Sequence, residues 1–94
     1  MSQAPIMPVF TDALLGDTLQ LSAEEFGAYC LLLLATWRNN GQALADDGHR
    51  LARICRVTPS RWAARLRPAL VSFFDVSDGT WHQKRLEKEW NYVE

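Results

Sequence analysis

Six of the ten basic residues of this 94-residue chain lie between Asp47 and Asp75, and no acidic residue interrupts them. They are Arg50, Arg53, Arg56, Arg61, Arg65 and Arg67. Because the arginine side chain presents a planar fork of donors that matches phosphate oxygens and guanine edges, such a cluster is typical of a surface that contacts nucleic acid. The whole chain carries a net charge of −1, so the positive charge is local. The alternative is that these arginines form the solvated faces of two amphipathic helices.

The residues that carry these arginines match a helix-turn-helix unit. Such a unit needs a small residue where its helices cross, which Ala52 supplies, and an apolar residue under the turn, which Val57 supplies. Thr58 followed by Pro59 suits the N-cap and the first position of the second helix. The apolar seam of that helix recurs at steps of four and consists of Trp62, Leu66 and Leu70. Pro68 is expected to kink or end the helix, because it lacks an N–H group.

The residues before this unit are predicted to form the main core helix. Residues 1–9 read as an extended lead-in, and residues 10–15 as a short helix that Thr11 caps and Gly16 ends. Ser22 to Glu25 matches a capping box that begins a longer helix ending near Arg38. The face expected to be buried consists of Phe26, Cys30, Leu33, Leu34 and Trp37. Gly27 is expected to mark a close approach of another backbone.

A β-hairpin is predicted to follow, because residues 73–76 and 80–83 alternate apolar and polar side chains around the turn residues 77–79. Residues 42–44 could add a short strand, and residues 86–92 are predicted to form a closing helix. A hairpin directly after a helix-turn-helix is the wing of a winged helix. We therefore expect a mainly α fold with a small β-hairpin (α+β), a winged helix-turn-helix, in one domain over residues 10–94.

Nothing in the sequence assembles a catalytic or metal site. His49 and His82 are isolated, and Cys30 and Cys55 occupy apolar helical positions without zinc-ligand spacing. No glycine-rich phosphate loop occurs. We therefore expect no enzymatic activity, no cofactor and no small-molecule substrate. The four tryptophans are interpreted as core residues. No segment is apolar for long enough to span a membrane and none reads as a signal peptide, so a cytoplasmic location is expected.

Residues 7–90 resemble the YdaU-like prophage domain family of unknown function. The resemblance rests on Met7-Pro8, Asp12, Asp17-Thr18, Leu21-Ser22, Glu25–Tyr29, Leu31–Leu33 and Trp37 in the first half. In the second half it rests on Leu51–Ile54, Trp62, Arg67-Pro68, Phe73-Phe74, Asp78-Gly79, Trp81 and Lys84–Leu86. This resemblance implies a winged-helix module from a phage replication region, often the N-terminal part of a longer chain. It implies no catalytic residues.

Two functions follow from these observations. In the first, the domain binds DNA and acts in phage replication initiation or regulation. The residues predicted to contact DNA are Arg53, Arg56, Thr58, Ser60, Arg61, Ala64, Arg65, His82 and Lys84. A homodimer or a replication-protein partner would then dock on the C-terminal helix. In the second, the domain is a protein–protein interaction module, a scaffold or dimerisation unit, without direct DNA contact. The two differ in whether the Arg61 and Arg65 face joins the hairpin in one positive surface.

Overall fold

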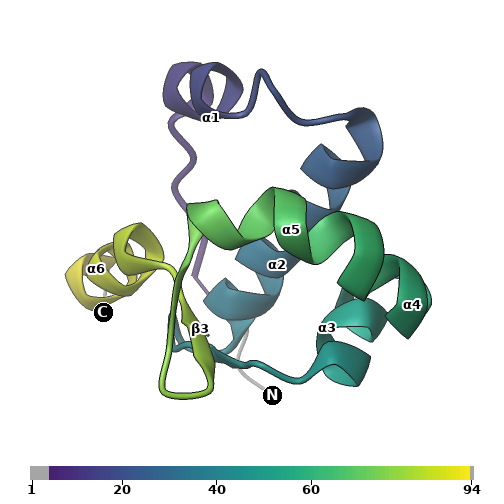
Figure 1. The fold of residues 1–94 in the computed structure, drawn as a ribbon. Helices are drawn as coiled ribbons and strands as arrows, with labels where there is room; N and C mark the ends of the chain where they lie inside the picture. The colour runs from purple at the N-terminus through teal and green to yellow at the C-terminus, as the bar shows by residue number, and fades with distance from the viewer. Residues whose placement is uncertain (1–4, 94) are drawn as a thin grey trace.

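The computed structural model describes residues 5–93, which fold mainly into helices with a small antiparallel sheet at one side (Figure 1). The first half contains α1 (Thr11–Asp17), α2 (Ala23–Arg38), β1 (Leu44–Ala45) and α3 (Gly48–Ile54). A second helical stretch follows as α4 (Pro59–Arg61), the π-helical segment η1 (Trp62–Leu66), α5 (Arg67–Leu70) and the 3-10 turn η2 (Val71–Phe73). The chain then forms β2 (Asp75–Ser77), β3 (Thr80–His82) and α6 (Lys84–Val93). The predicted α+β class is confirmed.

Helix α2 begins at the predicted capping box. The Ser22 hydroxyl accepts a hydrogen bond from the Glu25 N–H at 3.1 Å, and the Glu25 carboxylate accepts one from the Ser22 N–H at 2.8 Å. These two bonds satisfy donors that the first helical turn leaves without intrahelical partners. They also fix the direction of the first turn, which carries Glu24.

The predicted buried face of α2 is only partly correct. The buried residues of this helix are Ala28, Tyr29, Leu32, Thr36 and Trp37. Of the expected set only Trp37 is fully buried, and Leu34 is 49% exposed. The expected close approach at Gly27 is wrong, because no atom lies within 4 Å of where its Cβ would be. Because apolar residues lie on almost every side of this helix, their spacing in the sequence does not identify which face is buried.

The core has two parts, and the four tryptophans are buried in them as predicted. Trp62 and Trp81 lie in the larger cluster, which joins α2, α3, the α4–α5 stretch and the sheet. Trp37 and Trp90 meet edge to face in the smaller one, with ring centroids 4.9 Å apart. Helix α6 fits tightly against the turn that follows α2, since a Cβ on Gly41 would lie 2.7 Å from the Trp90 Cβ.

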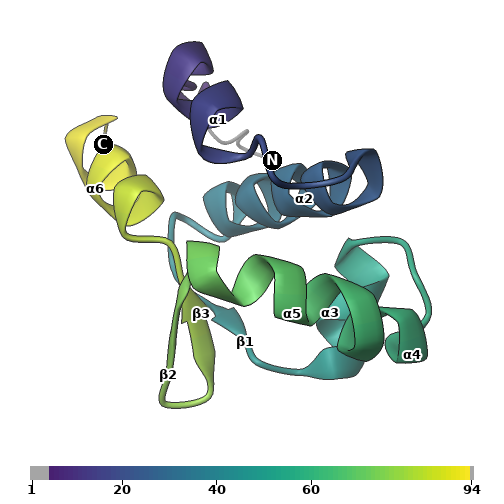
Figure 2. The same ribbon diagram turned by 45° about the horizontal axis from the view of Figure 1, so that its top comes forward.

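The helix that begins at Pro59 continues through Pro68, so of the two expected effects of this proline, a kink or an end of the helix, the end is not observed. The Arg67 N–H donates to the Trp62 carbonyl five residues back, which makes the turn before Pro68 a π turn. This wider turn shifts the hydrogen-bond register, so the helix continues past a residue that cannot donate. Figure 2 shows α4 and α5 as one irregular rod beside α3.

The hairpin turn forms at two residues, Asp78 and Gly79, both with positive φ (53° and 72°). This is the conformation that suits the right-handed twist of a tight hairpin. Strand β3 pairs with β2 on one side and with β1 on the other, so the sheet order is β1-β3-β2. The predicted short strand exists but is shifted to Leu44 and Ala45, and both hairpin strands are shorter than expected.

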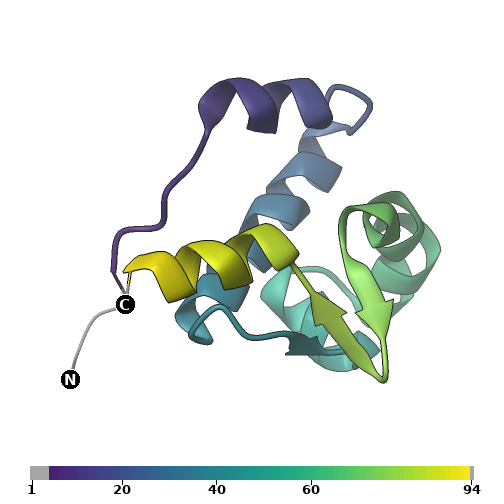
Figure 3. The same cartoon turned by 90° about the vertical axis from the view of Figure 1, so that its left-hand side faces the viewer.

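The N-terminal segment is attached to the core at a few points. Of the lead-in, residues 1–4 lie outside the described residues, and the Pro5 carbonyl accepts a hydrogen bond from the Trp37 indole at 2.6 Å. Helix α1 runs through Gly16 to Asp17 and has no side-chain cap, so the predicted end and the Thr11 cap are wrong. Only its Leu14 packs against the core. Figure 3 shows α1 standing apart from α6, with the purple lead-in running down one side from the start of α1 to the C-terminal end of α6.

Candidate nucleic-acid interface

The turn between α3 and α4 is a double hydrogen-bonded helix end. The Val57 N–H donates to the Ala52 carbonyl at 3.0 Å, and the Arg56 N–H donates to the Arg53 carbonyl at 3.1 Å. This pattern requires a left-handed residue just beyond the helix, a position that usually holds glycine. Here the residue is Arg56, with φ of 64°. The turn therefore presents an exposed arginine at a position where a side chain carries a conformational cost.

Helix α4 starts as the sequence predicts. The Thr58 hydroxyl accepts a hydrogen bond from the Arg61 N–H at 3.2 Å, and Pro59 occupies the first helical position. Trp62 and Leu66 point into the core and are 2% and 0% exposed. The opposite face of this stretch is exposed and carries Ser60, Arg61, Ala63, Ala64 and Arg65. The structure therefore brings together, on one exposed face, four of the residues that were predicted to contact DNA.

Arg61 is held by an acid that the sequence did not associate with it. Its Nε donates to Glu24 Oε2 at 2.8 Å and its Nη2 donates to Glu24 Oε1 at 2.7 Å. The hydrogen bond to Arg61 lowers the pKa of the Glu24 carboxyl, and the nearby charge of Arg65 lowers it further. Two parallel donors on one carboxylate form the geometry in which arginine also holds phosphate. Glu24 thus occupies the part of Arg61 that would contact DNA.

Arg67 is also engaged within the molecule. Its guanidinium lies 3.3 Å from Asp46 Oδ2 and 5.6 Å from the centre of the Trp81 ring. The other oxygen of Asp46 accepts a hydrogen bond from the Trp81 indole N–H at 2.8 Å. Since Trp81 is 0% exposed, Asp46 satisfies a donor that water cannot reach. Arg67 and Asp46 therefore join the sheet to α5.

The two hairpin-side residues predicted to contact DNA have acidic neighbours. Lys84 Nζ lies 3.8 Å from Asp75 Oδ2. The His82 ring bridges two side chains, with Nδ1 2.9 Å from Glu87 Oε1 and Nε2 2.8 Å from the Thr80 hydroxyl. The hairpin itself bears Asp75 and Asp78 and no lysine or arginine. The structure therefore does not join His82 and Lys84 to the Arg61 and Arg65 face in one positive surface.

Thr80, His82 and Glu87 form a hydroxyl–imidazole–carboxylate chain that resembles the connectivity of a catalytic triad. The Thr80 hydroxyl donates to the Ser77 carbonyl at 2.9 Å, so its proton is not directed at the imidazole. The chain links β3 to α6 and does not activate the hydroxyl.

The remaining arginines of the cluster differ from Arg61 and Arg67. Within residues 5–93, the side chains of Arg50, Arg53, Arg56 and Arg65 take part in none of the ion pairs. All four are exposed, on α3, the turn and η1. We use the name "arginine face" for Arg53, Arg56 and Arg65 together with Ser60 and Ala64.

Two further features bear on function. In the described part of the chain, no group of three or more histidine, cysteine or acidic side chains is arranged to hold a metal ion. Over the same residues, every helix is too short or too polar to span a bilayer.

The fold defines a small, mainly helical domain with a three-stranded sheet, and the domain carries the arginine face. The chain belongs to the family described as "Protein of unknown function (DUF1376)", whose model matches residues 5–91. It is 38% identical over 89 residues to the Escherichia coli protein named "Uncharacterized protein YdaU". The aligned region covers 95% of this chain and 30% of that relative, so the chain spans less than a third of the relative's length. No solved structure matches. The predicted family is thereby confirmed.

Proposed function

We propose that this domain is a winged helix-turn-helix that binds DNA through the arginine face, in phage or prophage replication initiation or regulation. The proposal is supported by the order of elements, in which α3, a tight turn and the α4–α5 stretch precede a hairpin whose inner strand pairs with β1. In this fold type the second helix enters the major groove. Here that helix exposes Ser60, Ala64 and Arg65 at its N-terminal half.

The observation that carries the proposal is the position of Arg56. An exposed arginine in the left-handed conformation has no packing reason to be there, because glycine would adopt the same backbone without steric cost. Strained positions of this kind concentrate at functional sites. Arg56 lies at the turn, with Arg53 one helical turn before it and α4 directly after it. Three arginines on this surface would neutralise phosphates on either side of a groove.

Glu24 supports a refinement of this proposal. Because it holds Arg61 in a bidentate pair, the domain presents a weaker positive face when free than its arginine count suggests. A DNA phosphate would compete with Glu24 for the same guanidinium donors. We propose that Arg61 joins the interface by this exchange, whereas Arg53, Arg56 and Arg65 make the first contacts.

The second function is the protein-interaction module. It is favoured by the feature that distinguishes the two functions, since the hairpin side, with its acidic neighbours, does not extend the positive surface of Arg61 and Arg65. The ion pairs of Arg61 and Arg67 with Glu24 and Asp46, and the two acids on the hairpin, favour it as well. Such acids would weaken phosphate contacts of the wing. In this version a homodimer or replication partner docks on α6.

Chemical-shift mapping of the ¹⁵N-labelled protein with a short DNA duplex separates the two functions. The DNA-binding proposal expects the largest shifts at Arg53, Arg56, Ser60 and Arg65, with α6 unchanged. If the folded protein showed no shift changes with DNA at low salt, this proposal would be contradicted. The interaction module would instead be supported if the shifts of α6 amides changed with protein concentration and did not respond to DNA.

A further inference from the structure

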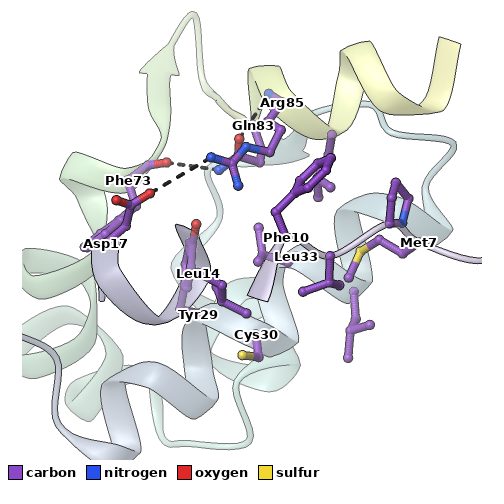
Figure 4. Close-up of a pocket in the computed structure, with 14 residues that line it drawn as sticks. Met7, Phe10, Leu14, Asp17, Tyr29, Cys30, Leu33, Phe73, Gln83 and Arg85 are labelled. Atoms are coloured by element: carbon purple, nitrogen blue, oxygen red, sulfur yellow. Dashed lines mark hydrogen bonds and ion pairs between the residues drawn. The ribbon is translucent and has the colours of Figure 1, made fainter. Parts of the chain in front are cut away.

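A pocket of about 470 Å³ lies on the other side of the molecule from α4, between the lead-in, α1, α2 and α6. Figure 4 shows its lining side chains converging from these segments. Most of them are apolar, among them Met7, Phe10, Leu14, Leu33, Leu34 and Leu86. Its volume is within the range of pockets that hold small molecules.

Tyr29 brings a polar group into this apolar lining. The residue is only 9% exposed, and its ring packs against Phe73 and Phe74. Its hydroxyl forms no hydrogen bond with any other group in residues 5–93, and burial raises its pKa. Since no fully buried side-chain N or O atom in residues 5–93 lacks a hydrogen-bond partner, this hydroxyl is reached by solvent, so a ligand in the pocket could accept its hydrogen bond. Figure 4 shows it pointing toward the end of the pocket where Asp17 and Arg85 lie.

Arg85 supplies a second donor at the same end. Its Nη2 lies 4.0 Å from Asp17 Oδ2, which is too long for a hydrogen bond, and its side chain is 51% exposed. The neighbouring Gln83 amide is already engaged, since its Nε2 donates to the Phe73 carbonyl and its Oε1 accepts from the Arg85 N–H. The donors left at this end are the Tyr29 hydroxyl and the Arg85 guanidinium.

We propose that this pocket binds a small amphipathic carboxylate, with its apolar body among the leucines and its carboxylate between the Tyr29 hydroxyl and Arg85. A carboxylate accepts both a phenolic O–H and a guanidinium N–H, and arginine can hold it through two parallel hydrogen bonds. The ligand is held and not converted. This inference is independent of the DNA-binding proposal, because its residues lie outside the arginine face.

The pocket has the size for a small molecule, but the same chemistry could come from a protein segment that bears an aromatic residue next to an acid. The proposal commits to the small molecule. A test must therefore include both sources.

The test is a ¹⁵N chemical-shift titration of the protein with 4-phenylbutyrate, with 4-phenylbutanol as the neutral control. We expect saturable shifts at amides of Leu33 and Leu86 with the acid and at least about tenfold weaker binding of the alcohol, since a charge-assisted hydrogen bond is lost. Equal binding of acid and alcohol would overturn the carboxylate site. No saturable shifts with the acid would overturn the site altogether.

Three variants test where the carboxylate of the ligand binds, because two are expected to weaken binding and one to tighten it. Arg85→Gln is expected to weaken binding of the acid by about tenfold, and Tyr29→Phe, which keeps the ring, by several-fold. Asp17→Asn removes a repelling charge and is expected to tighten binding by about threefold, on the scale of an exposed charge pair. A structural effect of the substitutions would not produce this change of sign. Unchanged or weaker binding by Asp17→Asn would contradict the placement of the carboxylate.

A dipeptide of phenylalanine and glutamate, blocked at both ends, distinguishes the sources. Binding weaker than that of 4-phenylbutyrate supports a small-molecule ligand. Tighter binding that also depends on Arg85 would assign the site to a protein segment and overturn the small-molecule proposal.

Discussion

Arg61 and Glu24 are 37 residues apart in the chain, and they meet in a bidentate ion pair with donor–acceptor distances of 2.7 and 2.8 Å. The pair joins the first turn of α2 to the first turn of α4. Both residues lie in the first turn of a capped helix, Glu24 after the Ser22 capping box and Arg61 after the Thr58 cap, so the caps position the backbone from which each side chain extends. The contact therefore follows from two local signals that the fold places side by side.

Removing this acid should strengthen DNA binding. In Glu24→Gln the carboxylate no longer competes for the Arg61 donors, and a negative charge near Arg65 is lost. We expect tighter binding, because Arg61 reaches the same phosphate without first being displaced from Glu24. Fluorescence anisotropy measures the affinity. In an Arg61→Ala background the same substitution should lose most of its effect, and an equal gain in that background would contradict the exchange.

Arg56→Gly should separate stability from binding. Glycine adopts the left-handed conformation without the Cβ clash, which stabilises the folded state, but its greater freedom in the unfolded chain offsets part of this gain. We therefore expect the free energy of unfolding to rise by about 0.5–1 kcal/mol. DNA affinity should fall, because an exposed cation leaves the turn. Urea denaturation and anisotropy report the two effects. A variant that binds DNA as tightly as the parent would remove Arg56 from the interface.

Asp46 should contribute to stability through the Trp81 indole. In Asp46→Ala the buried N–H loses its acceptor, which we expect to lower the free energy of unfolding by about 1–3 kcal/mol. Asp46→Asn retains a carbonyl oxygen at that position and should cost less, although it loses the charge that pairs with Arg67. Chemical denaturation of both variants provides the comparison. Equal losses in the two would assign the effect to the Arg67 ion pair instead.

Cys55 should be inert while the protein is folded. Burial raises the pKa of its thiol to about 12, from 9.0 in the unfolded chain. A raised pKa means that this group stabilises the fold fully below pH 9 and that the contribution is lost as pH rises from about 9 to about 12. In a Cys30→Ser variant, which leaves one thiol, alkylation at pH 8 should proceed only in denaturant. Rapid alkylation of the folded variant would contradict the burial of Cys55.

Local signals in the sequence predicted local features of the fold well. The Ser22 capping box, the Thr58-Pro59 helix start and the Asp78-Gly79 turn each depend on neighbours within a few residues, and all three are present. The π turn before Pro68 was not predicted, because it depends on the helix being held in place on both sides of the proline by Trp62 and Leu70 in the core.

The contacts that engage Arg61 and Trp81 could not be predicted from the sequence, for a different reason. Glu24 reaches Arg61, and Asp46 reaches Trp81, only after α2, α3 and the sheet have packed. No spacing rule links residues that far apart. The same holds for the pocket beside Tyr29, whose lining comes from segments at both ends of the chain.

The measurement that tests the central claim most directly is fluorescence anisotropy of a labelled duplex across a range of salt concentrations. It compares the parent with Arg53→Ala/Arg65→Ala and with Lys88→Ala/Arg85→Ala, which removes the same charge from α6. We expect affinity that falls steeply with salt, a slope reduced by about two units in the first double variant, and little change in the second. Absence of binding at low salt, or equal losses in both variants, would contradict a DNA interface at the arginine face.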